Sequence, residues 1–325
     1  MEQYDLIIIG GSAAATSAGV YAARRGLKFK ILTKDFGGEV ATSGIIENWP
    51  GVIHTDGIAL AQQFRAHLNS YKVDIEENVE VRSIVKQADG LFCVSVNKDG
   101  GTMAKDKTEE INVENPPTCN YDTKTVIVAT GVHPRRLGVP GEQEYRNKGV
   151  TYCTTCDGPL FQGRVTTVIG GGNSALESAL MLSEIATQVN VINKNSQFKG
   201  EQVLIDKLLS KSNVNIIYNA LTTEIMGQQF ITGIKYNDAD GKSNEIKTDG
   251  VFIHIGMVSN SSIAPPEVKK NEAGEIMVDR NCQTNMPGLY AAGDVTNVPF
   301  KQIIISAGQG CTATLSAVQY LNSQK

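Results

Sequence analysis

The sequence predicts an α/β fold that contains two copies of one strand–loop–helix unit. Two short apolar runs, at 6–9 and 165–169, are each followed by a glycine-rich loop and a helical pattern. The chain has 325 residues, of which 41% are apolar, so it is long enough for two domains with substantial cores. Strands that alternate with helices favour parallel sheets.

The overall composition argues against several functional classes. A formal net charge of −4 provides no general attraction to nucleic acid or to an anionic membrane surface. No stretch approaches the ~20 consecutive apolar residues of a membrane-spanning helix, and the chain starts without the basic and apolar regions of a signal peptide. We therefore expect a cytoplasmic enzyme that binds neither nucleic acid nor membranes.

The first glycine-rich loop is an imperfect dinucleotide-binding pattern. Gly10, Ser12 and Ala15 occupy the three positions of Gly-x-Gly-x-x-Gly/Ala. A helix predicted at 16–25 and a strand at 28–32 supply the context in which backbone N–H groups at a helix N-terminus face a pyrophosphate. Ser12 departs from the pattern, because glycine there lets the backbone approach phosphate closely. An ordinary strand–helix turn remains the alternative for this loop alone.

The segments that follow alternate between helical and extended patterns. A loop at 36–52 is long enough to indicate a function, and it holds the only tryptophan, which argues for order. The remaining predictions are a helix at 57–70, strands between 73 and 96, an exposed polar connection at 102–120, a buried strand at 125–129 and an interdomain connection at 132–150.

The second glycine-rich loop matches the pattern fully. Gly170, Gly172 and Ala175 stand at the three positions, after the predicted strand at 165–169. A helix is predicted at 176–185 and the next strand at 189–192, followed by a helix at 202–211, a strand at 214–218 and hairpins to about 255.

Two cysteines, Cys153 and Cys156, precede the second unit. Residues three apart in a strand lie ~10 Å from each other, beyond the ~7 Å limit for a disulfide, whereas a helix start brings them to ~5–6 Å. The sequence Thr-Thr between them and Asp-Gly-Pro after them favours a turn or short helix. Such a pair can cycle between dithiol and disulfide, and Asp157 can move the protons that this cycle requires.

Zinc binding and a purely structural disulfide are the alternatives for this motif. Zinc normally needs a second ligand pair, but the other four cysteines form no second Cys-x-x-Cys and the four histidines are scattered. We therefore predict no metal site. A structural disulfide is disfavoured because nothing in the chain indicates an oxidising compartment.

The last quarter of the chain contains a second kind of ligand signature. An apolar run at 289–292 ends in Gly293 and Asp294, whose carboxylate can face ligand hydroxyls, although Asp is also a common structural helix cap. Gln302 then precedes a helix predicted at 303–321, whose N-terminus carries about half a positive charge.

In this order, these motifs resemble those of the low-molecular-weight, flavin-dependent thioredoxin reductases, within the class II pyridine nucleotide-disulfide oxidoreductases. The stretches that carry the resemblance span nearly the whole chain: 37–51, 153–158, 170–180, 289–295 and 300–310. The resemblance implies two Rossmann-like, three-layer ββα nucleotide-binding domains, the second inserted in the first. An FAD-binding domain would comprise 1–130 and 254–325, and an NAD(P)H-binding-like domain with the cysteine pair would comprise 131–253.

The resemblance also implies the site residues and the partner. Cys156 would be the sulfur nearest the flavin, Cys153 its partner and Asp157 the proton donor and acceptor, with a disulfide of thioredoxin or a thioredoxin-like protein as substrate and a homodimer as the assembly. FAD would be held by Gly10, Ser12, Ala13, Gly37, Gly38, Asn48, Gly131, Asp294, Gln302 and Ile303. The nicotinamide dinucleotide would be held by Gly170, Gly172, Asn173, Ser174, Lys194 and Lys199.

The electron donor remains open. NADPH-using members of the family carry a His-Arg-Arg run and a later Arg that grip the 2′-phosphate, where this chain has Asn193-Lys194-Asn195 and Lys199. An NADH enzyme would offer an acidic residue near Asn193, and none is there. The hypotheses are a thioredoxin reductase fed by NADPH or NADH, a related flavin disulfide reductase fed by ferredoxin or another donor, a dithiol oxidase, and a flavoprotein that only binds partners. The intact Cys153, Cys156 and Asp157 argue against the last.

Overall fold

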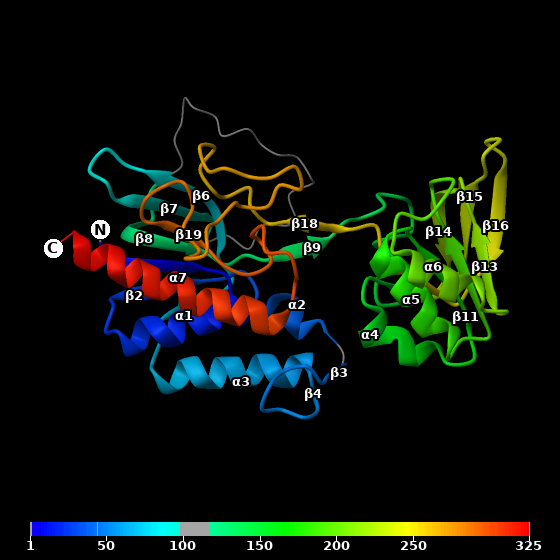
Figure 1. Cartoon of the computed structure of the whole chain (residues 1–325), viewed down its shortest axis with the longest axis horizontal. Helices are drawn as coiled ribbons and strands as arrows, with labels where there is room; N and C mark the ends of the chain where they lie inside the picture. The colour runs from blue at the N-terminus through cyan, green and yellow to red at the C-terminus, as the bar shows by residue number, and fades with distance from the viewer. Residues whose placement is uncertain (1, 44, 98–117, 325) are drawn as a thin grey trace. The chain divides into compact units, whose positions relative to one another are not determined.

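The structure is a computed structural model that describes residues 2–43, 45–97 and 118–324, without the side chains of Ile45 and Cys156. Most of the polar connection predicted at 102–120 therefore lies outside the described residues. The chain divides into two compact units (Figure 1). Unit 1 comprises Met1–Thr42, Ile46–His133 and Val258–Lys325, and unit 2 comprises Ser43–Ile45 and Pro134–Met257.

Unit 1 is built on a seven-stranded sheet in the order β5-β2-β1-β8-β7-β6, with β19 also paired to β8. The strands β1, β2, β5, β8 and β19 are parallel, whereas β7 runs antiparallel to β6 and β8. Their bounds are β1 Gln3–Ile9, β2 Phe29–Leu32, β5 Ile75–Glu76, β6 Glu80–Lys86, β7 Phe92–Asn97, β8 Tyr121–Val128 and β19 Leu289–Ala291.

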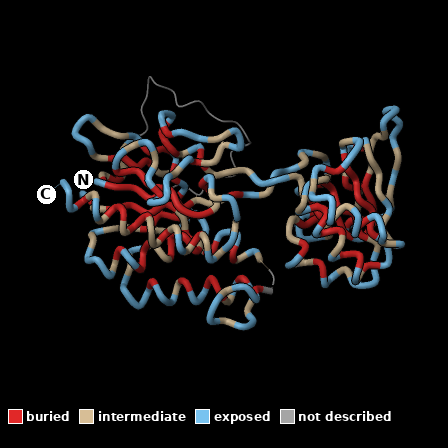
Figure 2. Tube along the Cα trace, viewed as in Figure 1, coloured by how far each residue is buried: buried red, intermediate tan, exposed pale blue. Residues whose placement is uncertain are grey.

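Alternate side chains of β1 enter two different cores, which explains its continuous apolar run. Leu6 and Ile8 pack with alanines of the helices α1 (Ala13–Arg24) and α7 (Ile303–Ser323). Ile7 and Ile9 pack on the other face, with Val81 and other apolar side chains. Buried residues accordingly fill the centre of this unit in Figure 2. The predicted strand buried on both faces is confirmed.

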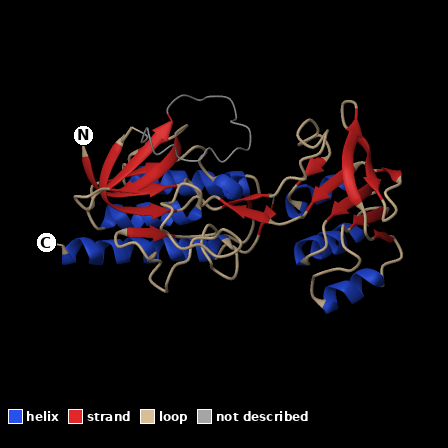
Figure 3. Ribbon diagram, turned by 90° about the horizontal axis from the view of Figure 1, so that it is seen from above, coloured by secondary structure: helices blue, strands red, loops and turns tan. Residues whose placement is uncertain are grey.

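Unit 2 has three layers. A parallel sheet in the order β10-β17-β11-β12-β13 lies between helices and a three-stranded antiparallel sheet, β14-β15-β16, and Figure 3 distinguishes its helices from its strands. The strands are β10 Val150–Thr151, β11 Val165–Ile169, β12 Gln188–Ile192, β13 Val214–Ile217, β14 Leu221–Gly227, β15 Ile231–Asn237, β16 Ser243–Lys247 and β17 Gly250–Ile253. The helices are α4 Thr154–Asp157, η1 Gly158–Phe161, α5 Asn173–Ser183 and α6 Gln202–Leu209.

Most predicted elements form near their predicted positions, with one difference in topology. The helix α3 occupies Gly57–Ser70 and β11 Val165–Ile169, as predicted. The prediction of hairpins up to residue 255 is wrong for β17, which pairs in parallel with β10 and β11 because its four residues are all buried.

The smaller elements complete the inventory. The long loop at 36–52 contains the short helix α2 Gly38–Ala41 and the strand β3 Ile45–Ile46, which pairs with β4 Thr55–Asp56. The two chain segments that connect the units pair as β9 Val132–Pro134 and β18 Met257–Ser259. Among the described helices, none combines the length and apolar character needed to cross a bilayer.

Candidate redox and nucleotide-binding sites

The first glycine loop has the close packing that a dinucleotide-binding turn requires. Gly10 adopts a φ of 130°, and a Cβ there would lie 2.2 Å from the carbonyl oxygen of Ala129 at the end of β8. Ser12 is the N-cap residue of α1, and its side chain makes no capping hydrogen bond. The N–H groups in the first turn of α1 therefore have no partner from the cap side chain and can serve a phosphate.

The start of the long loop packs across this turn. The Gly37 N–H donates to the Gly11 carbonyl at 2.9 Å, and a Cβ on Gly38 would lie 3.3 Å from the Cβ of Ser12. Both glycines have positive φ values, 101° and 52°. The first glycine loop and the predicted ligand loop thus form one surface at the N-terminus of α1.

Residues from the far end of the chain reach the same region. The Asn48 side-chain amide donates to Gln302 Oε1 at 3.2 Å across 254 positions, and Ile303 packs in one apolar cluster with Ala13. Asp294 follows Gly293, where a Cβ would lie 3.2 Å from the Cβ of Ala14.

The carboxylate of Asp294 accepts a hydrogen bond from Ser306 Oγ at 2.9 Å, and burial raises its pKa above the usual aspartate value. Gly131, three residues beyond the end of β8, has a φ of 65°, and its carbonyl accepts from the Asn260 N–H. The structure therefore brings most of the predicted FAD residues together around α1, with Gly131 following the neighbouring strand.

The second glycine loop repeats the geometry of the first. Gly170 adopts a φ of 147°, and a Cβ there would lie 2.1 Å from the carbonyl oxygen of His254. Gly172 is the N-cap residue of α5, and no atom lies within 4 Å of where its Cβ would be. The loop is thus open on the side from which a pyrophosphate would approach, and Ser174 is exposed in the first turn of α5.

The other predicted nicotinamide-site residues differ in their availability. The Lys199 N–H donates to the Gly171 carbonyl at 2.8 Å, which holds its exposed side chain beside the loop, and Lys194 is also exposed. The side chain of Asn173 instead exchanges two hydrogen bonds with Glu201, at 2.8 and 2.9 Å. Asn173 is therefore engaged within the chain.

The cysteine motif forms the start of a short helix, as its sequence predicts. Cys153 immediately precedes α4, and the Asp157 N–H donates to its carbonyl at 3.1 Å. Cys153 is disulfide-bonded and partly buried. The backbone of Cys156 lies in α4, whereas its side chain lies outside the described part of the chain.

A threonine that the sequence did not single out links the cysteine and the acid. Thr151, on β10, donates its hydroxyl proton to the Asp157 carboxylate and accepts a hydrogen bond from the Cys153 N–H at 3.2 Å. One hydroxyl thus fixes the carboxylate relative to the backbone at the first cysteine. No local signal distinguishes this threonine from others at the ends of strands.

A second group that the sequence did not reveal holds the other side of α4. The hydroxyls of Thr154 and Ser178 lie 2.8 Å from each other, and both lie 2.8 Å from Nε2 of His254. Burial lowers the pKa of His254 to about 4, so its ring is neutral near pH 7. The neutral imidazole accepts a proton from a hydroxyl, which ties α4 to α5 and to the end of β17.

Glu142 links the interdomain connection to the residue before Cys153. Its buried carboxylate accepts N–H groups from Leu137 and Gly138, at 2.8 and 2.7 Å, and the Tyr152 hydroxyl at 2.7 Å. Burial and this carboxylate raise the pKa of Tyr152, which stays protonated as a donor. Among the described residues, no group of three or more His, Cys, Asp or Glu side chains could hold a metal ion.

Two Rossmann-like units, each with a glycine loop at a helix N-terminus, and a disulfide cysteine beside an aspartate define a class of nucleotide-dependent redox protein. The comparison with known families agrees with this class. The family model for pyridine nucleotide-disulphide oxidoreductases matches residues 4–310, so the chain belongs to this family. Membership implies a flavin together with a nicotinamide cofactor.

Individual relatives narrow the comparison. One of the components of the alkyl hydroperoxide reductase of Pseudomonas putida is 40% identical over 322 residues, which are 98% of this chain but only 58% of that protein. The thioredoxin reductase of T. acidophilum is 38% identical, with full coverage of both chains and a TM-score of 0.73. A ferredoxin-flavin thioredoxin reductase of Clostridium acetobutylicum is 27% identical over 99% of both chains, with a TM-score of 0.52. The predicted resemblance to low-molecular-weight thioredoxin reductases and the predicted fold class are confirmed.

Proposed function

We propose that this protein is an FAD-dependent thioredoxin-disulfide reductase in which Cys153 and Cys156 form the disulfide that passes electrons to the substrate. The observation that carries the proposal is the arrangement at α4, where a disulfide-bonded Cys153 lies one helical turn from Asp157 and Thr151 contacts both residues. A redox cysteine motif needs a proton donor and acceptor beside it, and Asp157 supplies one.

The residues around α1 fit a flavin dinucleotide. Gly10 leaves space that a Cβ would fill, Gly38 lies against Ser12, and the Asp294 carboxylate is available to ribose hydroxyls. When bound, FAD supplies two-electron transfer between a hydride donor and a disulfide. Gln302 and the N-terminus of the 21-residue helix α7 would orient the flavin and favour negative charge near it.

The chain's own groups move and hold the protons. Reduction of the pair releases two thiol sulfurs, of which the thiolate is the reactive form. The carboxylate of Asp157 takes and returns a proton, and the Thr151 hydroxyl keeps that carboxylate in place. His254, Ser178 and Thr154 hold α4 on the side that is not used for proton transfer.

The second unit would bind NADPH or NADH through Gly170, Gly172 and Ser174. We favour NADPH, because Lys194 and Lys199 are exposed cations near the loop, and Lys199 is anchored to Gly171 by its backbone. The dimeric state and the cytoplasmic location that the resemblance implies are part of the proposal, and light scattering of the purified protein tests the dimer.

Two other functions have specific support. The 40% identity to part of an alkyl hydroperoxide reductase favours the disulfide of a peroxidase partner as a second candidate substrate. The likeness to a ferredoxin-flavin thioredoxin reductase favours ferredoxin as a second candidate donor.

Anaerobic titration of the flavin absorbance with NADPH, NADH and reduced ferredoxin, one at a time, tests the donor. Turnover of a thioredoxin disulfide with the active donor tests the substrate, with Cys153→Ser as the inactive variant. We expect bleaching by NADPH and thioredoxin reduction that Cys153→Ser abolishes. A protein that binds no FAD, or a serine variant with full turnover, would overturn the proposal.

A further inference from the structure

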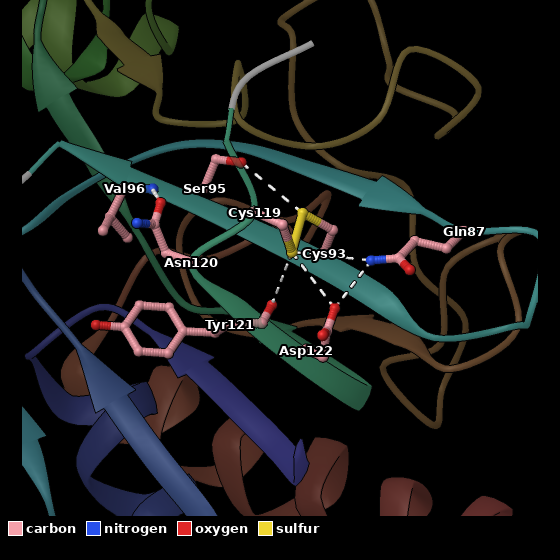
Figure 4. Close-up of a disulfide and its surroundings, with 8 residues drawn as sticks. All are labelled: Gln87, Cys93, Ser95, Val96, Cys119, Asn120, Tyr121 and Asp122. Atoms are coloured by element: carbon pink, nitrogen blue, oxygen red, sulfur yellow. Dashed lines mark hydrogen bonds between the residues drawn. A yellow bond between two sulfur atoms is a disulfide. The ribbon is translucent and has the colours of Figure 1, made fainter. Parts of the chain in front are cut away.

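Unit 1 contains a disulfide that lies outside the cysteine motif. Cys93 on β7 is bonded to Cys119, which lies two residues before β8, and their Cα atoms are 5.5 Å apart (Figure 4). This Cα separation falls in the usual range for disulfides. The bond joins positions 26 residues apart, and no spacing in the sequence indicates the pairing.

The disulfide lies at the opposite end of β8 from the candidate flavin site. Cys119 precedes the first residue of β8, whereas Ala129 and Gly131 follow its last residue. Eight strand residues span roughly 26 Å. Ligands of parallel sheets bind outside the carboxyl ends of the strands, so this disulfide lies away from the candidate electron path.

The two sulfurs have different surroundings. Cys93 is buried, with 6% of its surface exposed, whereas Cys119 is partly exposed. The carboxylate oxygen Oδ1 of Asp122 lies 3.4 Å from the Cys119 sulfur, and the Gln87 side-chain amide donates to that same oxygen at 2.9 Å (Figure 4). Cys93 lies 3.9 Å from the hydroxyl oxygen of Ser95.

These surroundings determine which sulfur can react and how fast. An external thiol can reach Cys119 but not the buried Cys93. Thiol–disulfide exchange proceeds by attack of a thiolate on a disulfide sulfur. The negative charge of Asp122 repels an incoming thiolate at Cys119, so exchange at this site is slowed.

We propose that Cys93 and Cys119 form a second thiol–disulfide couple of this protein, which exchanges slowly with low-molecular-weight thiols and disulfides through Cys119. The couple ties β7 to the start of β8 and takes no part in the transfer of electrons from the flavin. It is independent of the function proposed for Cys153 and Cys156.

The exchange balances without any group from the active site. A thiolate RS⁻ attacks the Cys119 sulfur, the Cys93–Cys119 bond breaks, and Cys93 leaves as a thiolate. A second RS⁻ attacks the R sulfur of the mixed disulfide, which releases the Cys119 thiolate and forms RSSR. Two external thiols are oxidised, one protein disulfide is reduced, and the two protons of the RSH molecules end on the protein sulfurs. Oxidation of the protein is the reverse.

Differential alkylation and peptide mass spectrometry of the holoprotein test the couple. We expect a linked Cys93–Cys119 peptide in protein purified without reductant, and its slow loss in buffers with a rising ratio of reduced to oxidised glutathione. Cys282 and Cys311 are free thiols and serve as internal references. Free Cys93 and Cys119 thiols in the air-purified wild-type protein would overturn the proposal, whether or not the variants fold.

Two single variants test the asymmetry. With Cys93→Ser, Cys119 should form a mixed disulfide with oxidised glutathione. With Cys119→Ser, Cys93 should stay unmodified in the folded protein. Equal modification in the two variants would contradict the assignment of Cys119 as the reactive sulfur.

Removal of the nearby charge tests the role of Asp122. Loss of a like charge at this distance in a water-like dielectric predicts about tenfold faster reduction by glutathione in Asp122→Asn. The matched control is Asp240→Asn, which removes the same charge from an exposed turn of unit 2. Equal rates in Asp122→Asn and the control would exclude the electrostatic effect.

The double variant Cys93→Ser/Cys119→Ser tests the separation from the electron path. It should keep the flavin content and the rate of flavin reduction of the wild-type protein. A loss of flavin reduction at normal flavin content would place the couple on the electron path and overturn that part of the proposal.

Discussion

The imidazole of His254 couples the folding of unit 2 to pH. Burial lowers its pKa to about 4, whereas the value in an unfolded chain is 6.5. Between these values the unfolded chain binds more protons than the folded chain, so stability falls as the pH falls. The penalty is absent above pH 6.5 and complete below pH 4, and the pKa difference corresponds to about 3 kcal/mol.

Replacement of His254 by glutamine isolates this contribution. The glutamine oxygen can still accept the hydrogen bond that Nε2 receives from Ser178 or Thr154, but the side chain cannot be protonated. Carboxylates that titrate in the same range are shared by both proteins and cancel in the difference. The stability of the wild-type protein relative to His254→Gln should therefore fall by most of those ~3 kcal/mol between pH 7 and pH 4.5.

Two measurements check this expectation. Nuclear magnetic resonance of the ring C–H groups should show four histidine titrations, of which the one missing in His254→Gln has its midpoint near 4. Urea unfolding of both proteins at pH 7 and pH 4.5 gives the free-energy difference. A His254 midpoint close to 6.5, or a stability difference that does not change with pH, would refute the reasoning.

Three further predictions concern the candidate sites. Thr151→Val should lower the rate of disulfide reduction by roughly tenfold or more, because a hydrogen bond to a charged group contributes about 1.5–3 kcal/mol, whereas Thr151→Ser should stay near the wild-type rate in the same turnover assay. Gly10→Val should abolish flavin absorbance, and Gly170→Val should keep it but lose reduction by the nicotinamide donor, since both side chains would collide with a backbone carbonyl. Lys199→Ala should raise the KM for NADPH and leave that for NADH unchanged, and equal changes for both would exclude a 2′-phosphate contact.

The parts of the fold that the sequence predicted well are those set by local pattern. The Gly57–Ser70 helix begins after Asp56, whose carboxylate accepts the Ala59 N–H at 2.8 Å, so a capping residue marked its start. The strand Val165–Ile169 is a short apolar run before a glycine loop. In both places neighbouring residues carry the signal that determines the structure.

The parts that the sequence did not predict depend on long-range pairing. β17 looked like one strand of a hairpin, but its buried residues pair with strands some 85 and 100 positions earlier in the chain. The contact of His254 with Thr154 spans 100 positions, and the bond between Cys93 and Cys119 follows from the register of β7 against β8. Periodicity and spacing carry no information about such pairs.

The two units use equivalent positions for different purposes. In unit 1 the Ala129 N–H donates to the carbonyl of Ile9, and in unit 2 the His254 N–H donates to the carbonyl of Ile169, both at 2.8 Å. The carbonyls of Ala129 and His254 also pack against the first glycine of the loop in their own unit.

The residue after the last parallel strand therefore has the same backbone role in both units. Only in unit 2 does it carry a side chain that reaches the redox helix. A substitution at this one position of the repeated fold is enough to join the nucleotide loop, through its backbone, to the cysteine helix, through its imidazole. Movement of the second glycine loop should consequently be coupled to α4, whereas the alanine in unit 1 provides no such connection.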